Sequence, residues 1–523
     1  MGIRPFNARM RRIGLPTLLT TLLCACSAPH RVEVVELSVD QAQAAMAAGT
    51  CSSRSLTQAY LDRIASIDDA GPMLNAVIEL NPRALDEAAA LDRERAAGQV
   101  RGPLHGIPVL LKDNIDAVGL VNSAGSLALA DHRPAVDAFL VARLRAAGVV
   151  ILGKTNLSEW ANFRSTRSTS GWSSRGGQTR NPYAVDRSPC GSSAGTGAAI
   201  AASLATVGVG TETDGSIICP AAMNGLVGLK PTVGLVSRTG IIPISISQDT
   251  AGPMGRTVTD VARMLDVIAA VDPNDPAAPG SKGHRPANYA ASLQTTALRG
   301  KRIGVLRQAM GYHPGVDARM TEAIAAVRAQ GAEVMDIAVP TYNAWNEHEI
   351  TVLLHEFKDG LNRYLQQAGT RVNSLEALIA WNREHADQVM PYFGQELLEL
   401  AQSTGPLTDA AYVQARDEAK RLAGQDGLFA ALNANRLDAV IAPSTSPAWM
   451  IDPVLGDHFV GAGYAMAAVA GTPSLTVPMG DVEGLPVGLT WMGRAYSEAE
   501  LLGLAYAFEQ ATAKRYAPQD RER

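Results

Sequence analysis

The chain has 523 residues and a mass of 55.0 kDa, and 46% of its residues are hydrophobic while 19% are charged. A chain of this composition can bury a sizeable core, which excludes an intrinsically disordered or collagen-like protein. The formal net charge is -5, although the first 25 residues hold four arginines and no acidic residue. The remainder is therefore still more acidic, and nucleic acid is not expected as a partner.

The N-terminus has the pattern of an export signal. Basic residues up to Arg12 precede an apolar run over Ile13 to Cys26, which at 14 residues is too short to span a bilayer. Its end, Leu23-Cys24-Ala25-Cys26, resembles the bacterial lipobox, in which the last cysteine is acylated after cleavage before it. We therefore expect a signal peptide over 1–25, lipidation of Cys26 and a tether over 26–36. Ordinary secretion with cleavage near Ala25 is the alternative.

From Leu37 onward, helical and strand patterns alternate, which indicates an α/β domain over residues 37–520. Ser38 is placed to cap a first helix that ends near Gly49. Further helices are expected near 135–147 and 198–205, and strands over 149–152, 206–210, 302–306, 439–442 and 474–477. The Pro/Gly/Asp-rich segment 272–286 is predicted to be a surface excursion inside a single domain.

The five cysteines form no Cys-x-x-Cys pair and no Cys/His cluster of zinc spacing, so neither a metal site nor a disulfide framework is indicated. Cys190 and Cys219 both lie near the segments considered next. A bridge between them is conceivable, but buried free thiols are the commoner case. The sequence does not predict a disulfide.

Three segments carry the chemistry. In Gly106 to Asn114, Lys112 directly follows an apolar stretch, and burial would lower its pKa and leave a free amine as a base. The plain alternative is a lysine at a strand end that reaches solvent. Segment 188–197 is rich in Ser and Gly. It could present catalytic hydroxyls at the start of a helix, and the plain alternative is an ordinary loop that caps the helix. In segment 210–217, a glycine before Ser216 permits converging N–H groups, or marks a simple turn.

Together these segments resemble the amidase signature family from about Leu37 to Tyr516. The resemblance implies a Ser-cisSer-Lys triad with Ser216 as nucleophile, Ser192 as bridging serine and Lys112 as base. It also implies an oxyanion hole of backbone N–H groups from Thr213, Asp214, Gly215 and Ser216. The implied fold is a single large α/β domain whose central mixed β-sheet is covered by helices on both faces. The implied chemistry needs no cofactor.

Within the family, the segments 153–163, 176–183 and 211–222 resemble those of bacterial peptide amidases, which remove the C-terminal amide of peptides and release ammonia. Most family members read Gly-Gly-Ser-Ile-Arg where this chain reads Asp214-Gly215-Ser216-Ile217-Ile218. Without that arginine, and with an acid beside the oxyanion site, an anionic acyl group is disfavoured. A peptide amide or another neutral carboxamide is the expected substrate.

The physical logic of this triad is independent of the family. A serine at its own pKa is a poor nucleophile, so Ser216 needs a base, which Lys112 supplies through the hydroxyl of Ser192. No histidine is required. The nine histidines of the chain indeed fall in no motif that also holds a serine and an acid.

Several alternatives stay open. Gly191 to Gly195 matches the Gly-x-Ser-x-Gly elbow of α/β-hydrolases with Ser193 at its centre, but no strand pattern precedes it. The others are a general aliphatic or aryl amidase, the glutaminase-type subunit that serves tRNA amidation, which export would exclude, and a non-catalytic peptide-binding lipoprotein. Specificity is expected from residues 342–406, whose aromatics are predicted to be mostly core and partly pocket wall: Trp345, Phe357, Trp381, Tyr392 and Phe393.

Overall fold

The computed structural model describes residues 1–3 and 32–519. Cys24 and Cys26, and with them the expected cleavage and lipidation site, lie outside these residues. Residues 32–36, assigned to a tether from the sequence, pack against the domain. Val34 is buried, and the Arg515 guanidinium donates to the Glu36 carboxylate at 2.6 Å. Residues 32–36 are therefore part of the folded domain.

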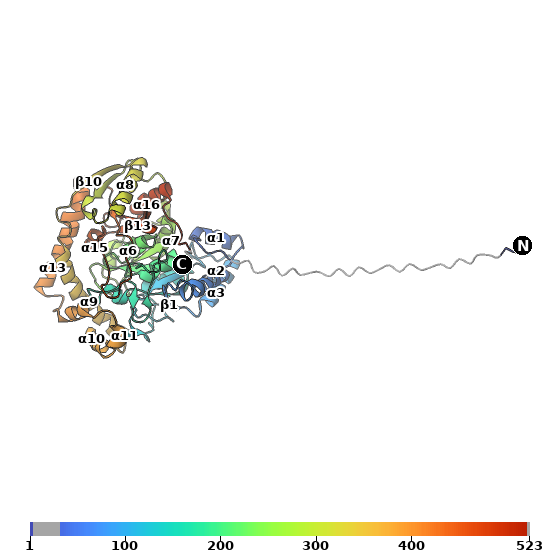
Figure 1. Cartoon of the computed structure of the whole chain (residues 1–523), viewed down its shortest axis with the longest axis horizontal. Helices are drawn as coiled ribbons and strands as arrows, with labels where there is room; N and C mark the ends of the chain where they lie inside the picture. The colour runs from blue at the N-terminus through green and yellow to red at the C-terminus, as the bar shows by residue number, and fades with distance from the viewer. Residues whose placement is uncertain (4–31, 520–523) are drawn as a thin grey trace.

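A mixed sheet of 11 strands forms the centre of the molecule (Figure 1). Its spatial order is β1-β3-β2-β6-β8-β7-β12-β13-β11-β9-β10. The strands are β1 (Val77–Leu80), β2 (Pro108–Lys112), β3 (Val150–Thr155), β6 (Val207–Glu212), β7 (Val227–Lys230), β8 (Thr250–Gly255), β9 (Arg302–Leu306), β10 (Glu333–Ile337), β11 (Ala439–Pro443), β12 (Ser474–Val482) and β13 (Leu485–Met492). A separate two-stranded ribbon pairs β4 (Trp172–Ser173) with β5 (Gly177–Gln178).

Continuous burial marks the central strands β2, β3, β6, β7, β8, β11 and β13. Because successive side chains of a strand point to opposite faces, both faces of the sheet are covered. The predicted α/β class, with a mixed sheet covered by helices on both faces, is confirmed.

The helices of the described residues surround this sheet. In Figure 1, α1, α2 and α3 lie on the right-hand side of the domain, and α9 and α13 lie on the left-hand side. They are α1 (Val39–Ala47), α2 (Ser53–Arg63), α3 (Ala84–Ala96), α4 (Phe139–Ala146), α5 (Ala194–Ala201), α6 (Ile218–Met223), α7 (Val258–Ile268), α8 (Pro314–Ala329), α9 (Asn346–Ala368), α10 (Leu375–Glu384), α11 (Ala386–Val389), α12 (Glu396–Ser403), α13 (Ala410–Lys420), α14 (Ala430–Ala434), α15 (Ala465–Ala470) and α16 (Glu498–Thr512).

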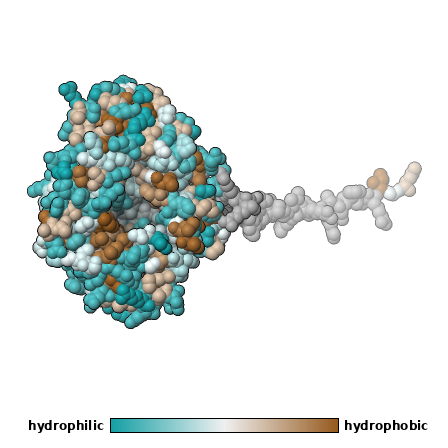
Figure 2. Space-filling view, turned by 60° about the vertical axis from the view of Figure 1, so that its left-hand side comes forward, coloured by the Kyte–Doolittle hydropathy of each residue, from teal (hydrophilic) through white to brown (hydrophobic). Residues whose placement is uncertain are grey.

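None of the helices within residues 32–519 has the length and apolar character that crossing a bilayer requires. The face of the molecule in Figure 2 is mostly hydrophilic, with separate hydrophobic patches.

Most predicted elements are present, with shifted ends. Ser38 caps α1 as expected, since its Oγ accepts from the Gln41 N–H and its own N–H donates to Gln41. The helix predicted over 198–205 is wrong in its bounds, because α5 already begins at Ala194. All eight residues of α5 are buried, so tertiary packing overrides the low helix propensity of Gly195 and Gly197.

A buried ion pair stabilises the segment that follows β2. The Lys154 Nζ lies 3.2 Å from a carboxylate oxygen of Asp113, and both side chains are fully buried. Arg175 approaches the other oxygen at 3.3 Å. The same Lys154 ammonium also donates to the Ile115 carbonyl at 2.8 Å. Since Asp113 immediately follows Lys112, this network fixes the chain where β2 ends.

Lys154→Met should lower the free energy of unfolding by roughly 3 to 5 kcal/mol, because it leaves the buried Asp113 carboxylate with too little compensation. Arg363→Ala, which removes an exposed pair with Asp359 on α9, is the matched control and should cost less than about 1 kcal/mol. Urea unfolding of the two variants measures both values. Equal losses would contradict the importance of the buried pair.

Candidate active site

Strands β2 and β6 bring the predicted site residues to one edge of the sheet. The strands pair in parallel, with Leu111 opposite Val209, so their carboxyl ends lie side by side. Lys112 ends β2, and the turn that carries Ser216 follows β6. The Ser193 N–H, at the start of α5, donates to the Ser216 carbonyl at 3.1 Å. The fold thus gathers all three segments singled out from the sequence.

Lys112 is fully buried and surrounded by neutral oxygens. Its Nζ lies 2.7 Å from Ser192 Oγ, 2.8 Å from Thr211 Oγ1 and 3.1 Å from the Thr211 carbonyl oxygen. Burial lowers the pKa of Lys112 to about 7, although the carboxylates of Asp249 and Glu212 partly oppose this shift. In the neutral amine, two N–H bonds can serve the Thr211 oxygens and leave the lone pair for the Ser192 hydroxyl.

The two predicted serines differ in their surroundings. The peptide bond between Gly191 and Ser192 is cis, and the Ser192 carbonyl accepts from the Ser158 N–H at 3.1 Å. Ser192 is 1% exposed, whereas Ser216 is 9% exposed. Ser192 therefore lies deeper, beside the lysine, and Ser216 lies nearer to solvent.

The predicted oxyanion residues are consecutive in the turn after β6. Gly215 has φ +79°, and a Cβ there would lie 2.2 Å from the Tyr464 ring, so only glycine fits. The Glu212 carboxylate accepts from the N–H groups of Ile217 at 2.7 Å and Ile218 at 2.9 Å, and the Gly215 N–H also faces it. Glu212 thus folds the turn back onto the strand end. It is a residue that sequence analysis did not single out.

Two carboxyl groups lie beside the turn. Burial, together with the charges of Glu349 and Glu212, raises the pKa of Asp214 well above its usual range. Burial raises the pKa of Glu349 to about 7, although the side-chain amide of Gln248 donates to it at 2.8 Å. Repulsion between the two carboxylates contributes to the raised pKa of Asp214. Glu349 comes from α9, and no local sequence pattern connects it with Ser216.

Most of the aromatic residues expected to influence specificity lie in the core, as predicted. Trp345 and Phe357 belong to the core. Phe393 is buried and Tyr392 is 52% exposed, and their rings lie 5.1 and 5.7 Å from the Trp172 ring. Trp381 is half-buried against the cluster that includes Phe357. Tyr392 is the most exposed member of this set, and a role of these residues as pocket walls stays a prediction.

A cavity of about 260 Å³ lies between the loop over 238–250 and α9. It is lined by Asn114, by Thr211 and by Thr213 of the predicted oxyanion turn, but by neither serine. Within residues 32–519, no group of three His, Cys, Asp or Glu side chains is arranged to hold a metal ion.

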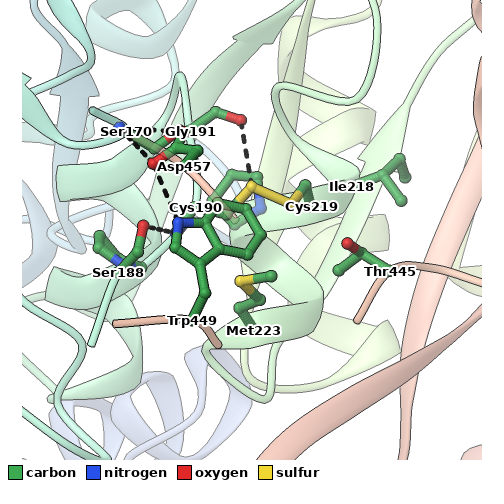
Figure 3. The surroundings of a disulfide bond; sticks show 12 residues. Ser170, Ser188, Cys190, Gly191, Ile218, Cys219, Met223, Thr445, Trp449 and Asp457 are labelled. Atoms are coloured by element: carbon green, nitrogen blue, oxygen red, sulfur yellow. Dashed lines mark hydrogen bonds between the residues drawn. A yellow bond between two sulfur atoms is a disulfide. The ribbon is translucent and has the colours of Figure 1, made fainter. Parts of the chain in front are cut away.

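Cys190 and Cys219 form a disulfide bond, with their Cα atoms 6.0 Å apart (Figure 3). The sequence left this pairing open because it gave no distance between segments 29 residues apart. Cys51 is a free cysteine.

Comparison with known proteins agrees with this arrangement. The family model described as "Amidase" matches residues 55–502. The chain belongs to the amidase signature family. It is an amide-hydrolysing enzyme, and its fold is close to that of peptide amidases. The native peptide amidase from Stenotrophomonas maltophilia is 56% identical, with a TM-score of 0.90 over 93% of this chain and 99% of that one.

Two further similarities were found, one to a solved structure and one to a sequence relative. A structure of the peptide amidase PAM in complex with the competitive inhibitor chymostatin is 57% identical, with a TM-score of 0.91 over 92% of this chain and 99% of that one. A probable amidase from Arabidopsis thaliana is 38% identical over 93% of this chain and 92% of its own length. Both similarities thus extend over nearly the whole of each chain.

The contact between Lys112 and Thr211 predicts a pH effect. If Lys112 is the base, it must be neutral to accept a proton, so kcat/KM is predicted to rise with pH and level off above about 7. Thr211→Val removes an acceptor that stabilises the ammonium, so the rise should move to lower pH and the rate should fall about tenfold. Thr211→Ser keeps the hydroxyl and should retain both. Identical pH profiles for all three enzymes would contradict this interpretation.

Proposed function

We propose that the enzyme removes the C-terminal amide of peptides, with Ser216 as nucleophile and Lys112 as base acting through Ser192. The observation that carries this proposal is the 2.7 Å contact between the buried Lys112 amine and the Ser192 hydroxyl. An amine with a pKa of about 7 is a competent base at neutral pH.

In the proposed reaction, Ser216 Oγ attacks the carboxamide carbon while its proton passes to Ser192 Oγ, whose own proton passes to Lys112 Nζ. Backbone N–H groups of the turn over 213–216 stabilise the oxyanion, an effect of ~2.7 to 4 kcal/mol per donor in other hydrolases. The relay then runs backward and protonates the departing nitrogen, which leaves as ammonia. Water hydrolyses the acyl-enzyme to the peptide carboxylate and free Ser216.

The charges beside Ser216 favour a neutral substrate. Two acidic side chains, Asp214 and Glu349, lie beside the turn that carries Ser216, and an anionic acyl group would meet like charge there whenever either is ionised. The position of the usual family arginine is held by Ile218, which is fully buried. The competitive inhibition of a 57% identical peptide amidase by chymostatin supports a peptide-like ligand.

A substrate panel tests this proposal. Peptide amides, aryl amides and simple carboxamides are each incubated with the full chain, and released ammonia is measured. Peptide amides should have the highest kcat/KM. Equal or faster turnover of aryl or simple amides would favour a general amidase. Peptide binding without any turnover would favour a non-catalytic lipoprotein.

The proposed roles predict distinct variants. Ser216→Ala should not form an acyl-enzyme and should lose at least about 10³-fold in kcat, as other serine hydrolases do. Lys112→Arg should be inactive because a guanidinium cannot deprotonate. Ser193→Ala should still be labelled by a fluorophosphonate at Ser216, detected by mass spectrometry. Labelling that depends on Ser193 instead would support the α/β-hydrolase alternative.

We also propose that the enzyme is an exported lipoprotein, anchored through acyl chains on Cys26. The N-terminal pattern of basic residues, short apolar run and Leu23 to Cys26 supports this location. The Cys190–Cys219 bridge is consistent with an oxidising compartment.

Cys26→Ser should release the enzyme from the membrane fraction, because anchoring needs the acyl chains. Turnover of the released enzyme should equal that of the wild type. Fractionation followed by an ammonia assay measures both. A wild-type protein that is recovered in soluble form, with a mature N-terminus other than Cys26, would replace lipidation by simple secretion.

A further inference from the structure

The disulfide joins the two segments that carry the serines. Cys190 precedes Ser192 by two residues, and Cys219 follows Ser216 by three residues in the first turn of α6. The bond therefore forms a short covalent path between the loop before α5 and the turn after β6. Neither cysteine has a part in the proposed proton relay.

Hydrogen bonds also connect these segments. The Ser193 N–H donates to the Ser216 carbonyl at 3.1 Å, and the Asn224 side-chain amide donates to the Pro189 carbonyl at 2.9 Å. Hydrogen bonds can lengthen or exchange with water, whereas the S–S bond fixes the separation of Cys190 and Cys219. The disulfide is thus the firmest of these three connections.

The bridge is buried in a packed environment. Cys190 is 5% exposed and Cys219 is 1% exposed, and both lie in a cluster of mostly apolar side chains with Met223 and Trp449 (Figure 3). The Trp449 indole is itself held by a hydrogen bond to Asp457 at 2.9 Å. Movement of the bridge would require this cluster to repack.

The residue between Cys190 and Ser192 is confined as well. A Cβ on Gly191 would lie 2.2 Å from Ser158 Oγ and 3.4 Å from Ser170 Oγ. The Ser170 hydroxyl and N–H both donate to Asp457, which also accepts from Trp449. Gly191, which precedes Ser192, is therefore packed against Ser158 and Ser170, and the preceding Cys190 is packed in the cluster around the disulfide. A displacement of the Cys190 backbone would therefore also displace the Ser192 backbone.

From this geometry we infer that the Cys190–Cys219 bridge positions the Ser192 hydroxyl between Ser216 and Lys112, so that amide hydrolysis depends on the oxidised bridge. The inference rests on the proposed function, because it concerns the proposed relay. Cys190 and Cys219 are positioning residues, since they touch no reacting atom. A misplacement of about 1 Å at such a site can reduce a rate by about 10²-fold.

The experiment compares bridged and unbridged forms of the full chain at 25 °C. The unbridged forms are the double variant Cys190→Ser/Cys219→Ser and wild type reduced with a phosphine, with bond status confirmed by alkylation and peptide mapping. Cys51→Ser, which removes the free cysteine, is the matched control. Measurements are kcat, KM and the pH dependence of kcat/KM for a peptide amide, with circular dichroism to confirm folding.

Both unbridged forms should remain folded, lose about 10- to 100-fold in kcat and change KM by less than about threefold. The pH at which kcat/KM levels off should also shift, because the Lys112 contact with Ser192 is altered. Cys51→Ser should match wild type in every measurement.

Wild-type kcat and pH dependence in a folded unbridged form, with only a lower melting temperature, would overturn the inference and leave the bridge as a stabiliser of the fold. Loss of folding in both unbridged forms would overturn it in the same way, because the bridge would then act on the whole domain. Failure of the proposed function has another signature, since Ser216→Ala would then hydrolyse the amide at the wild-type rate with the bridge intact.

Discussion

The organisation of the site depends on taking one amine out of water. Lys112 ends a strand whose five residues are all buried, and its nitrogen meets only neutral oxygens within hydrogen-bond distance. Desolvation destabilises the charged ammonium but not the neutral amine, so the Lys112 amine can act as a base near neutral pH. The lowered pKa of Lys112 requires that the end of β2 be buried. Helices on both faces and the turn after β6 together exclude water from it.

Three fully buried lysines show how partners decide the role of such a residue. Burial lowers the pKa of each of Lys112, Lys154 and Lys230. Lys154 has the Asp113 carboxylate at 3.2 Å, which opposes the lowering of its pKa and makes it part of a structural network. Carboxylates also influence Lys230, whose pKa remains higher, at about 8. Lys112 has hydroxyl and carbonyl partners instead, which stabilise a charge less well and leave its amine free to accept a proton.

The site is assembled from segments that lie far apart in the chain. Lys112 and Ser192 are 80 residues apart, and Glu349 comes from α9, far along the chain from both serines. Parallel pairing of β2 with β6 aligns two of these segments, and the disulfide holds the loop before α5 against α6. Secondary structure alone would leave the relative positions of the two serines undefined. The disulfide and the hydrogen bond from the Ser193 N–H to the Ser216 carbonyl fix these positions.

The sequence by itself determined the α/β class and the family, and it singled out Lys112, Ser192 and Ser216 as candidate site residues, because these inferences depend on local patterns and short motifs. It also determined the cap at Ser38, since capping needs only residues three positions apart. The bounds of α5 were decided by tertiary burial, which overrides the weak helix propensity of Gly195 and Gly197. The burial of Lys112, the pairing of Cys190 with Cys219 and the approach of Glu349 to Asp214 were decided by the fold alone. Each is a distance between remote segments, and a linear pattern carries no information on such a distance until the sheet order and the packing of its helices are fixed.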